Sequence, residues 1–492
     1  MNLDPFQQEA AEQKNRYSVI IAGAGTGKTF TLLGRIQYLV KECGMDPKEI
    51  MVISYTNETV KEFSFKCQKV LGFSVSVMTF HKLAMYLLEL THSFYQICDS
   101  NFLAYIVNEF MEVICMQNKN LQKSFFYSMP MSCRFSLKNR KKWKGDLTKQ
   151  IINLIVLCKS KGYDEEFVQK LFQKYRGRKK HIFLITYVNF LLYESEKESQ
   201  NYFDFDDIVV KAKLSISQIK KSIFPFRHIL VDEFQDSSVI RIELLHQLVI
   251  HFDMDFTVVG DDCQSIYRFS GTESNCFKLL EHYFPNVSYY FLKYTYRNSQ
   301  ELVQVADRFV QKSSVQIKKE VLSFKHLSCP IEILYYRKKN SIYQMISYVI
   351  KQIPNSSILF LGRNSFDWKY YFQEERIQWI DQKHFYLKEF DKIQFTFLTV
   401  HQSKGLEADV VILLHVENSI YGFPNQMKPY FFHDIFFGKE QIKFEEERRL
   451  FYVALTRTKG KIFLVTPIEA SSIFVNELVR EHRKLIKRKY FF

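Results

Sequence analysis

Glycine and proline are scarce in this sequence of 492 residues, which contains only 16 and 10 of them. Large apolar residues are abundant instead, with 47 phenylalanines and 29 tyrosines. This balance excludes a collagen-like or disordered chain and indicates a packed globular protein. Because a chain of this length exceeds one ordinary hydrophobic core, we expect two to four domains.

The nine cysteines form no CxxC pair and show no short spacing typical of metal ligands. Neither a zinc site nor a disulfide framework is therefore expected, and a reducing cytoplasm fits the pattern. The opening residues, MNLDPFQQEAAEQKN, lack the apolar core of a signal peptide, and no apolar run is long enough to span a membrane. We expect a soluble cytoplasmic protein with no membrane partner.

The net charge of +15 is unevenly distributed. Residues 134–181 contain 15 lysines and arginines against four acidic residues, which accounts for +11 of the total, and a second basic cluster lies at 480–489. Such runs often form only a solvated helical surface. They indicate a polyanionic partner when the rest of the chain requires one.

A glycine-rich loop lies between a strand-like and a helix-like segment near the start of the chain. The apolar run at 18–22 leads into the loop AGAGTGKT, and a helical pattern follows at 30–40. In this context backbone N–H groups converge on phosphate oxygens, while the lysine reaches the terminal phosphates and the threonine hydroxyl ligates Mg²⁺. The alternative is a glycine-rich turn with a chance lysine. We predict an ATP site formed by Ala22, Gly23, Ala24, Gly25, Thr26, Gly27, Lys28 and Thr29.

A second apolar run, at 228–231, ends in the acidic segment DEFQD. Ligands of parallel α/β sheets bind at the carboxyl ends of the strands, where these acids lie. We predict that Asp232 holds Mg²⁺ together with Thr29, and that Glu233 is the base that orients the attacking water. An isolated acidic pair after a strand can instead be the N-terminal charge of a helix, but combined with Lys28 it forms a two-part ATPase site.

A third strand-like run, at 256–260, leads into Gln264, Tyr267 and Phe269. The Gln264 amide can bind a γ-phosphate, and the two aromatic side chains offer stacking faces nearby. In a chain so rich in phenylalanine, both rings can equally belong to the hydrophobic core.

Taken in chain order, nine short segments resemble the motif series of UvrD/Rep-like superfamily 1 DNA helicases. The segments are LDPFQ at 3–7, the glycine-rich loop at 22–29, SYTN at 54–57, TFH at 79–81, DFDD at 204–207, DEFQD at 232–236, GDDCQSIY at 260–267, VHQSKGLE at 400–407 and EEERRLFYVALTR at 445–457. The resemblance implies an α/β fold of two RecA-like P-loop domains with parallel sheets. It also implies a mainly helical insertion in the first domain and an ATP site in the cleft between the two.

The same resemblance implies roles for individual residues. Gln7 would read the adenine, Tyr296 would stack on it, and Glu407 would hold the ribose. Catalysis would combine Glu233 and Gln264 with two arginines from the second domain, Arg297 and Arg457. Single-stranded DNA, held by base stacking that tolerates any sequence, would contact Tyr55, Thr56, Asn57, Phe80, His81, Tyr267, Phe269, Arg363 and His401.

This chain departs from the family pattern in several places. Four positions carry a residue unusual for the family: Phe30 and Ser270, where arginine is usual, and Glu58 and Thr59, where lysine and alanine are usual. The largest departure is a deletion, because only about 35 residues separate Arg363 from Thr399 where the family carries a large helical accessory domain. We expect that domain to be absent or reduced to one or two elements.

We expect a first RecA-like domain at 1–95 and 203–280, a basic helical insertion at 96–202 and a second RecA-like domain at 281–492. We expect no C-terminal nuclease domain, because only a helical, basic tail follows the last motif, which ends near Arg457.

Two functions remain open. The chain is either an ATP-dependent helicase and translocase that moves 3′ to 5′ and binds single strands and duplex junctions, or a DNA-sensing ATPase subunit. Such a subunit would serve a partner nuclease in repair or in an anti-phage complex, for example of the Gabija type. A catalytically dead scaffold is disfavoured because Lys28, Asp232 and Glu233 are all present.

Overall fold

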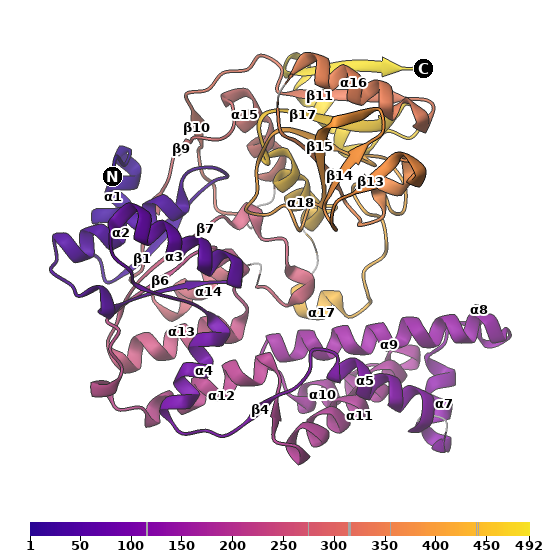
Figure 1. Cartoon of the computed structure of the whole chain (residues 1–492). Helices are drawn as coiled ribbons and strands as arrows, with labels where there is room; N and C mark the ends of the chain where they lie inside the picture. The colour runs from indigo at the N-terminus through magenta and orange to yellow at the C-terminus, as the bar shows by residue number, and fades with distance from the viewer. Residues whose placement is uncertain (115–116, 274, 313–315, 355, 439, 441) are drawn as a thin grey trace.

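The computed structural model describes residues 1–114, 117–273, 275–312, 316–354, 356–438, 440 and 442–492. Two mixed helix-and-sheet domains stack on one another, and a group of helices extends from the first of them (Figure 1). Among the described residues, no helix combines the length and apolarity that a membrane crossing requires.

The sheet of the first domain is wholly parallel. Its strands, in spatial order, are β3 (Ser76–Thr79), β2 (Ile50–Ser54), β6 (His228–Val231), β7 (Asp255–Gly260), β1 (Tyr17–Ile21) and β8 (Ser288–Phe291). The strands β1, β2, β6 and β7 are buried almost throughout, as expected for a parallel sheet covered on both faces.

Helices cover both faces of this sheet. One face packs against α1 (Pro5–Glu12), α2 (Lys28–Lys41) and α3 (Asn57–Leu71). The other packs against α4 (Phe80–Leu90), α12 (Phe205–Ser215), α13 (Val239–Phe252) and α14 (Cys276–Tyr283). The strands predicted at 18–22, 228–231 and 256–260 and the helix predicted at 30–40 are confirmed by β1, β6, β7 and α2. The domain boundary at residue 280 is wrong, because β8 completes the first sheet beyond it.

The insertion begins and ends at a short parallel pair, β4 (Gln96–Ile97) with β5 (Tyr202–Phe203). Between them lie α5 (Phe102–Glu109), a π-helix (Phe110–Ile114), α7 (Lys119–Ser128), α8 (Met131–Arg134), α9 (Leu137–Ser160), α10 (Glu165–Lys174) and α11 (Gly177–Ser199). These helices share their own core around Leu147, Ile151 and Phe183. The long α9 and the short α8 at its far end project beyond the rest of the molecule (Figure 1).

The second domain contains an eight-stranded sheet. Its order is β13 (Ile377–Trp379), β14 (His384–Leu387), β15 (Phe390–Thr399), β12 (Ile358–Gly362), β16 (Ala408–Leu413), β17 (Thr458–Pro467), β11 (Ile331–Tyr336) and β18 (Ile486–Phe491). All neighbours from β15 to β18 are parallel, whereas β13, β14 and β15 pair antiparallel. One face packs against α15 (Gln300–Val310), α18 (Glu445–Leu455) and α19 (Ile473–Glu481), the other against α16 (Ile342–Gln352).

The region where an accessory domain was expected to be missing is fully described by the structure. Residues 364–398 form short 3₁₀ turns, the hairpin of β13 and β14, and most of β15. These residues form more than the one or two elements that were expected, and they extend the second sheet instead of forming a domain of their own.

A segment of the second domain reaches back to the helical insertion. The loop between β16 and α18 contains α17 (His433–Phe437), and Phe432 is buried in the core of the insertion. Arg268 of the first domain donates to the carbonyl oxygen of Phe437 at 2.6 Å, and its guanidinium lies 4.5 Å from the centre of that ring. The core of the insertion therefore includes a residue, Phe432, from outside the limits of 96–202 that the sequence suggested.

Candidate functional site

A cleft of about 670 Å³ lies between the two domains, at the carboxyl edge of the first sheet. Its lining from the first domain includes Gly25, Thr26, Gly27, Lys28, Thr29, Phe30, Asp232, Glu233 and Gln264. The second domain contributes Tyr296, Arg297, Gly405, Leu406, Glu407, Arg457 and Lys459. Residues from distant parts of the chain meet here because parallel strands place their carboxyl ends along one edge.

The glycine-rich loop connects β1 to the N-terminus of α2. Gly27 caps that helix in the left-handed region, with a φ of 81°. A Cβ atom there would lie 2.6 Å from Gln7 Nε2, and one on Gly25 would lie 2.5 Å from Arg297 Cβ. Glycine is thus required at both positions, and the loop leaves the first N–H groups of α2 directed at the cleft, an arrangement that binds anions.

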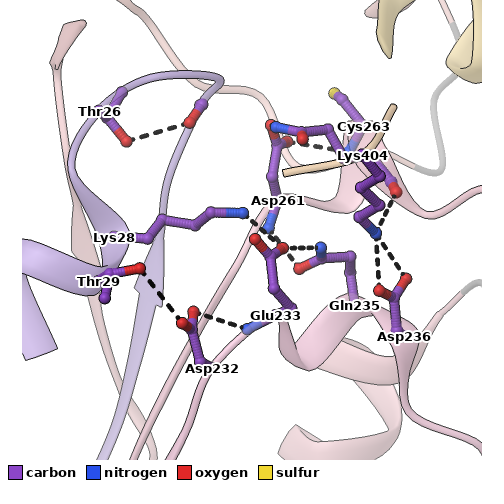
Figure 2. Close-up of polar contacts among 12 residues, drawn as sticks. Thr26, Lys28, Thr29, Asp232, Glu233, Gln235, Asp236, Asp261, Cys263 and Lys404 are labelled. Carbon is purple, nitrogen blue, oxygen red and sulfur yellow. Dashed lines mark hydrogen bonds and ion pairs between the residues drawn. The ribbon is translucent and has the colours of Figure 1, made fainter. Parts of the chain in front are cut away.

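Two side-chain pairs join the loop to the acidic segment after β6 (Figure 2). Lys28 Nζ lies 2.6 Å from Glu233 Oε2, and Thr29 Oγ1 donates to Asp232 Oδ2 at 3.4 Å. Burial and the neighbouring Glu233 raise the pKa of Asp232. Burial alone would also raise the pKa of Glu233, but the ammonium groups of Lys28 and Lys404 outweigh it and lower that pKa. Glu233 therefore stays a carboxylate, as a hydrogen-bond acceptor facing the cleft must be.

The backbone and a neighbouring amide hold Glu233 in place. The residue adopts the left-handed conformation, with a φ of 52°, which is sparsely populated for a side chain of this size. Gln235 Nε2 donates to the Glu233 carboxylate, and the N–H of Asp261 donates to Gln235 Oε1 at 2.8 Å. Sequence reasoning assigned no role to Gln235, although it lies within the DEFQD segment that was singled out.

The second domain places two guanidinium groups in the same cleft. Arg457 is 1% exposed and donates to Gln264 Oε1 at 3.3 Å. Burial and the nearby Arg297 lower the pKa of Arg457 to about 9. Arg297 Nε donates to Glu407 Oε2 at 2.7 Å, and Lys459 Nζ lies 3.0 Å from Glu407 Oε1. An anion entering the cleft would relieve the repulsion between the two arginines.

Lys404 bridges the two domains and was missed as an individual residue. Its Nζ donates to the two carboxylate oxygens of Asp236 at 2.7 and 2.8 Å and to the carbonyl oxygen of Gln264 at 2.9 Å (Figure 2). The lysine follows β15 of the second domain, whereas both acceptors belong to the first. The segment VHQSKGLE was recognised and contains Lys404, but the sequence did not show that Asp236 would be the acceptor of this lysine.

Two residues expected at the adenine end differ in their availability. Tyr296 is 48% exposed and its hydroxyl donates to Asp4 Oδ2 at 2.7 Å. The amide of Gln7 is engaged at both ends, because Nε2 donates to the carbonyl oxygen of Thr26 at 3.0 Å and Oε1 accepts from the N–H of Asp4. Gln7 thus supports the phosphate loop in this structure, whereas Tyr296 presents an open ring to the cleft.

Three of the residues expected to contact DNA form one aromatic group between the domains. The ring centres of Phe269 and His401 lie 5.6 Å apart, and those of Tyr267 and Phe269 lie 6.3 Å apart. Tyr267 donates from its hydroxyl to the carbonyl oxygen of His401 at 3.1 Å. Phe269 is 60% exposed, so of the two readings of this ring, core or stacking face, the exposure favours the stacking face.

Other expected DNA contacts have different surroundings. Phe80 is 2% exposed and packs in the core of the first domain, so the expectation that its ring meets DNA is wrong. The ring of Tyr55 lies against that core, with its hydroxyl bonded to Ser237, and the pKa of His81 is lowered by burial to about 4. Thr56 and Asn57 are exposed at the start of α3.

Arg363 is not available as a simple cation. Its guanidinium binds the carboxylate of Glu447 through three contacts of 2.7 to 3.1 Å. Because Glu447 neutralises this charge, a DNA phosphate would have to compete with a bidentate carboxylate.

The donor set of the cleft fits a nucleoside triphosphate with a divalent cation. The glycine-rich loop, Lys28, Arg297 and Arg457 supply N–H groups and positive charge for phosphates, while Thr29 and Asp232 supply hard oxygen ligands for Mg²⁺. Glu233 lines the same cleft and holds a carboxylate beside these groups. The arrangement can therefore bind and hydrolyse a phosphoanhydride.

Comparison with known proteins gives two family matches. Residues 3–285 match the UvrD/REP helicase N-terminal domain, and residues 380–467 match the UvrD-like helicase C-terminal domain.

Individual relatives share about a quarter of their residues with this chain. DNA helicase IV of Escherichia coli (strain K12) is 26% identical over 97% of this chain and 70% of its own length. A probable DNA helicase of Mycoplasma pneumoniae is 25% identical over 100% of this chain and 89% of its own. ATP-dependent DNA helicase Rep of Escherichia coli is 26% identical over 66% of this chain, and the match spans only 45% of that protein.

Proposed function

The chain belongs to the UvrD/REP helicase family, and from this premise we propose that it is an ATP-hydrolysing motor that moves 3′ to 5′ along single-stranded DNA. Membership makes it an ATP-driven DNA helicase. The direction of movement, the residue roles and the use of Mg²⁺ are the finer parts of the proposal.

One observation carries the proposal: two domains contribute opposite sides of a single phosphate-binding cleft. Lys28 and Glu233 come from the first domain, and Arg297 and Arg457 from the second, with Arg457 hydrogen-bonded to Gln264 across the boundary. Hydrolysis in such a cleft changes the contacts between the domains, so that a chemical step becomes a relative movement.

The residues of the cleft divide the chemical work. ATP with its Mg²⁺ supplies the phosphoanhydride bond and its leaving group. Lys28 and the N–H groups of the glycine-rich loop bind the phosphates, Glu233 accepts a hydrogen bond from the attacking water and orients it, and Arg457 balances the negative charge that grows on the transferred phosphoryl group. The ion pair between Lys404 and Asp236 joins the acidic segment beside the cleft to the segment that contains His401, so that a movement of one segment is transmitted to the other.

The aromatic group provides the test on the DNA side. Replacing Phe269 by alanine is expected to weaken single-strand binding by about 1–3 kcal/mol, because one base would lose its stacking partner. Fluorescence anisotropy with an oligonucleotide measures this, and the melting transition should remain cooperative because Phe269 is largely exposed. Phe80→Leu is the matched control, since that buried ring should affect stability and leave the DNA affinity unchanged. Unchanged affinity in Phe269→Ala would remove this ring from the DNA path.

A DNA-sensing ATPase subunit that serves a nuclease is the weaker alternative. The relatives named above are all helicases by name, and none of these names refers to a nuclease complex or to antiviral defence. Whether the chain unwinds duplex DNA alone is a separate question for experiment, because a motor without the accessory domain has less surface with which to hold duplex DNA.

We assign duplex junctions to the basic stretch of the helical insertion, residues 134–181, which we call the helical arm. Arg140, Lys141 and Lys142 are exposed on α9, whereas Lys144 is paired with Glu112 at 2.5 Å. Changing the three exposed residues to glutamate is expected to weaken binding of a tailed duplex more than binding of a single strand. The slope of log affinity against log salt should also fall by roughly 0.9 for each lost phosphate contact.

Anisotropy titrations at several salt concentrations measure both effects. The matched control changes Lys487, Arg488 and Lys489 of β18 to glutamate, which removes the same charge from the opposite end of the molecule (Figure 1). Equal losses for duplex and single strand, or an equal effect of the control, would show that the arm contributes only general charge.

A further inference from the structure

A second cavity lies on the part of the second domain that replaces the missing accessory domain. Its volume is about 580 Å³, within the usual range of roughly 300–1,000 Å³ for small-ligand sites. The lining comes from the β13–β14 hairpin, from the turn after β12 and from the start of the VHQSKGLE segment. It shares no lining residue with the ATP cleft.

Two indole rings form one corner of this cavity. The ring centres of Trp368 and Trp379 lie 5.3 Å apart with an angle of 70° between the planes. Trp368 packs against the core of the second domain, and Phe385 supports Trp379 from 5.0 Å. Trp379 is nevertheless 38% exposed. The corner is therefore held in place by the core while one aromatic surface stays open.

The rim of the cavity continues into residues already connected with DNA. Gln402 lines it and follows His401 of the aromatic group. The Gln402 Oε1 atom accepts from both the N–H and the hydroxyl of Thr399 at 3.0 Å, which fixes this side chain at the end of β15. Single-stranded DNA in contact with His401 would thus lie one protein residue away from the lining of the cavity.

Lys383 of the hairpin interacts electrostatically with a residue of the first domain. Lys383 lines the cavity, and the pKa of Glu58 is lowered by hydrogen bonds from its own N–H and from Thr56, and further by Lys61 and Lys383. Lys383 therefore lies within electrostatic range of the segment after β2 that was expected to contact DNA. The acid of the lining, Asp381, accepts from the N–H groups of Lys383 and His384 and is used inside the hairpin turn.

We propose that this cavity binds a nucleobase of the single strand, stacked on Trp379, next to the position occupied by Phe269 and His401. Stacking on an indole accepts every base, and Lys383 supplies a cation for the adjoining phosphate, so the site takes single-stranded nucleic acid without reading its sequence. The hairpin thereby gives the second domain a grip on the strand. This proposal rests on the function proposed above, because it requires DNA between the domains.

Intrinsic fluorescence tests the proposal directly. The chain has three tryptophans, and the third, Trp143, is buried in the helical insertion. In Trp143→Phe, emission comes only from the two indoles of the cavity. Adding an unlabelled thymidine oligonucleotide should quench this emission, with the same concentration dependence as anisotropy measured on a labelled copy.

Two variants extend the test. Trp379→Ala should weaken single-strand binding by about 5- to 150-fold and remove most of the quenching. Trp379→Phe, which keeps an aromatic face, should recover most of the affinity. Recovery by phenylalanine separates stacking from a general loss of fold, and thermal melting of both variants checks that the second domain remains intact.

The outcomes separate this proposal from the proposed function. Oligonucleotide binding and stimulated ATP hydrolysis without any change in emission would overturn the cavity proposal alone and leave the proposed function standing. If the unmodified chain neither binds the oligonucleotide nor responds to it in ATP hydrolysis, the proposed function itself fails. Quenching that persists unchanged in Trp379→Ala, with unchanged affinity, would also overturn the proposal.

Discussion

Replacing Glu233 by glutamine is expected to lower the rate of ATP hydrolysis by about 10²–10⁴-fold while leaving ATP binding nearly intact. Glutamine has the same shape and keeps an oxygen that accepts from Lys28, which lies 2.6 Å from the Glu233 carboxylate. It lacks the negative charge needed to orient water and accept its proton. Single-turnover hydrolysis, measured beside the affinity for a fluorescent ATP analogue, separates the two effects.

Glu62→Gln is the matched control for this change. Glu62 lines the same cleft, but its carboxylate pairs with Lys66 of its own helix, α3, whereas the Glu233 carboxylate pairs with Lys28. Its neutralisation should leave the rate close to that of the unmodified chain. If Glu233→Gln hydrolyses ATP at an ordinary rate, Glu233 is not the base, and the carboxylate then only balances the charge of Lys28.

Replacing Arg457 by alanine is expected to lower the rate of ATP hydrolysis by about 10³–10⁵-fold, the range typical of an arginine that stabilises a transferring phosphoryl group. Arg457 is buried at the boundary between the domains, next to Gln264 and within the coulombic range of Glu233. ATP affinity should change much less, because the loop and Lys28 remain. Steady-state and single-turnover rates give the measurement.

Two further variants guard against a structural explanation. Arg457→Lys keeps a positive charge and should lose less activity than alanine. Arg448→Ala removes an arginine of α18 whose guanidinium is paired with Glu477 of the same domain at 2.6 Å, and should leave hydrolysis almost unchanged. Equal rates in Arg457→Ala and the unmodified chain, with both proteins folded, would exclude Arg457 from the chemistry.

The parts of the site that could be predicted are those fixed by local sequence. Strand, glycine-rich loop and helix follow one another directly, so β1, Gly27 and Lys28 needed no long-range information. Asp232 and Glu233 follow β6, and the rule that ligands bind at the carboxyl ends of parallel strands brought them to the same edge as the loop. The family resemblance then added the arginines of the second domain.

The parts that could not be predicted depend on contacts between distant segments. Phe80 begins α4 between Thr79 and His81, which are only partly buried, and only the packing of the first core shows that its ring is fully buried. The role of Lys404 could not be predicted, because its acceptor Asp236 lies 168 residues away in the sequence. The docking of Phe432 into the helical insertion follows from neither periodicity nor composition, because a short aromatic run fits many surroundings.

The reduced accessory region shows a similar limit. Counting residues between Arg363 and Thr399 correctly predicted that a separate domain would not fit there. The count could not show that the remaining chain adds β13 and β14 to the second sheet and brings Trp368 and Trp379 together. The count also could not show that this hairpin pairs antiparallel at one edge of a sheet whose other strands are parallel, as expected.

The measurement that tests the central claim most directly is the rate of ATP hydrolysis by the unmodified chain, with and without single-stranded DNA. A motor whose cleft is formed by two domains should hydrolyse ATP slowly alone and much faster when a strand bound between the domains brings Arg457 and Glu233 to the same phosphate. The rate should rise with DNA concentration to a plateau. An ATPase rate that is the same with and without single-stranded DNA would contradict the account.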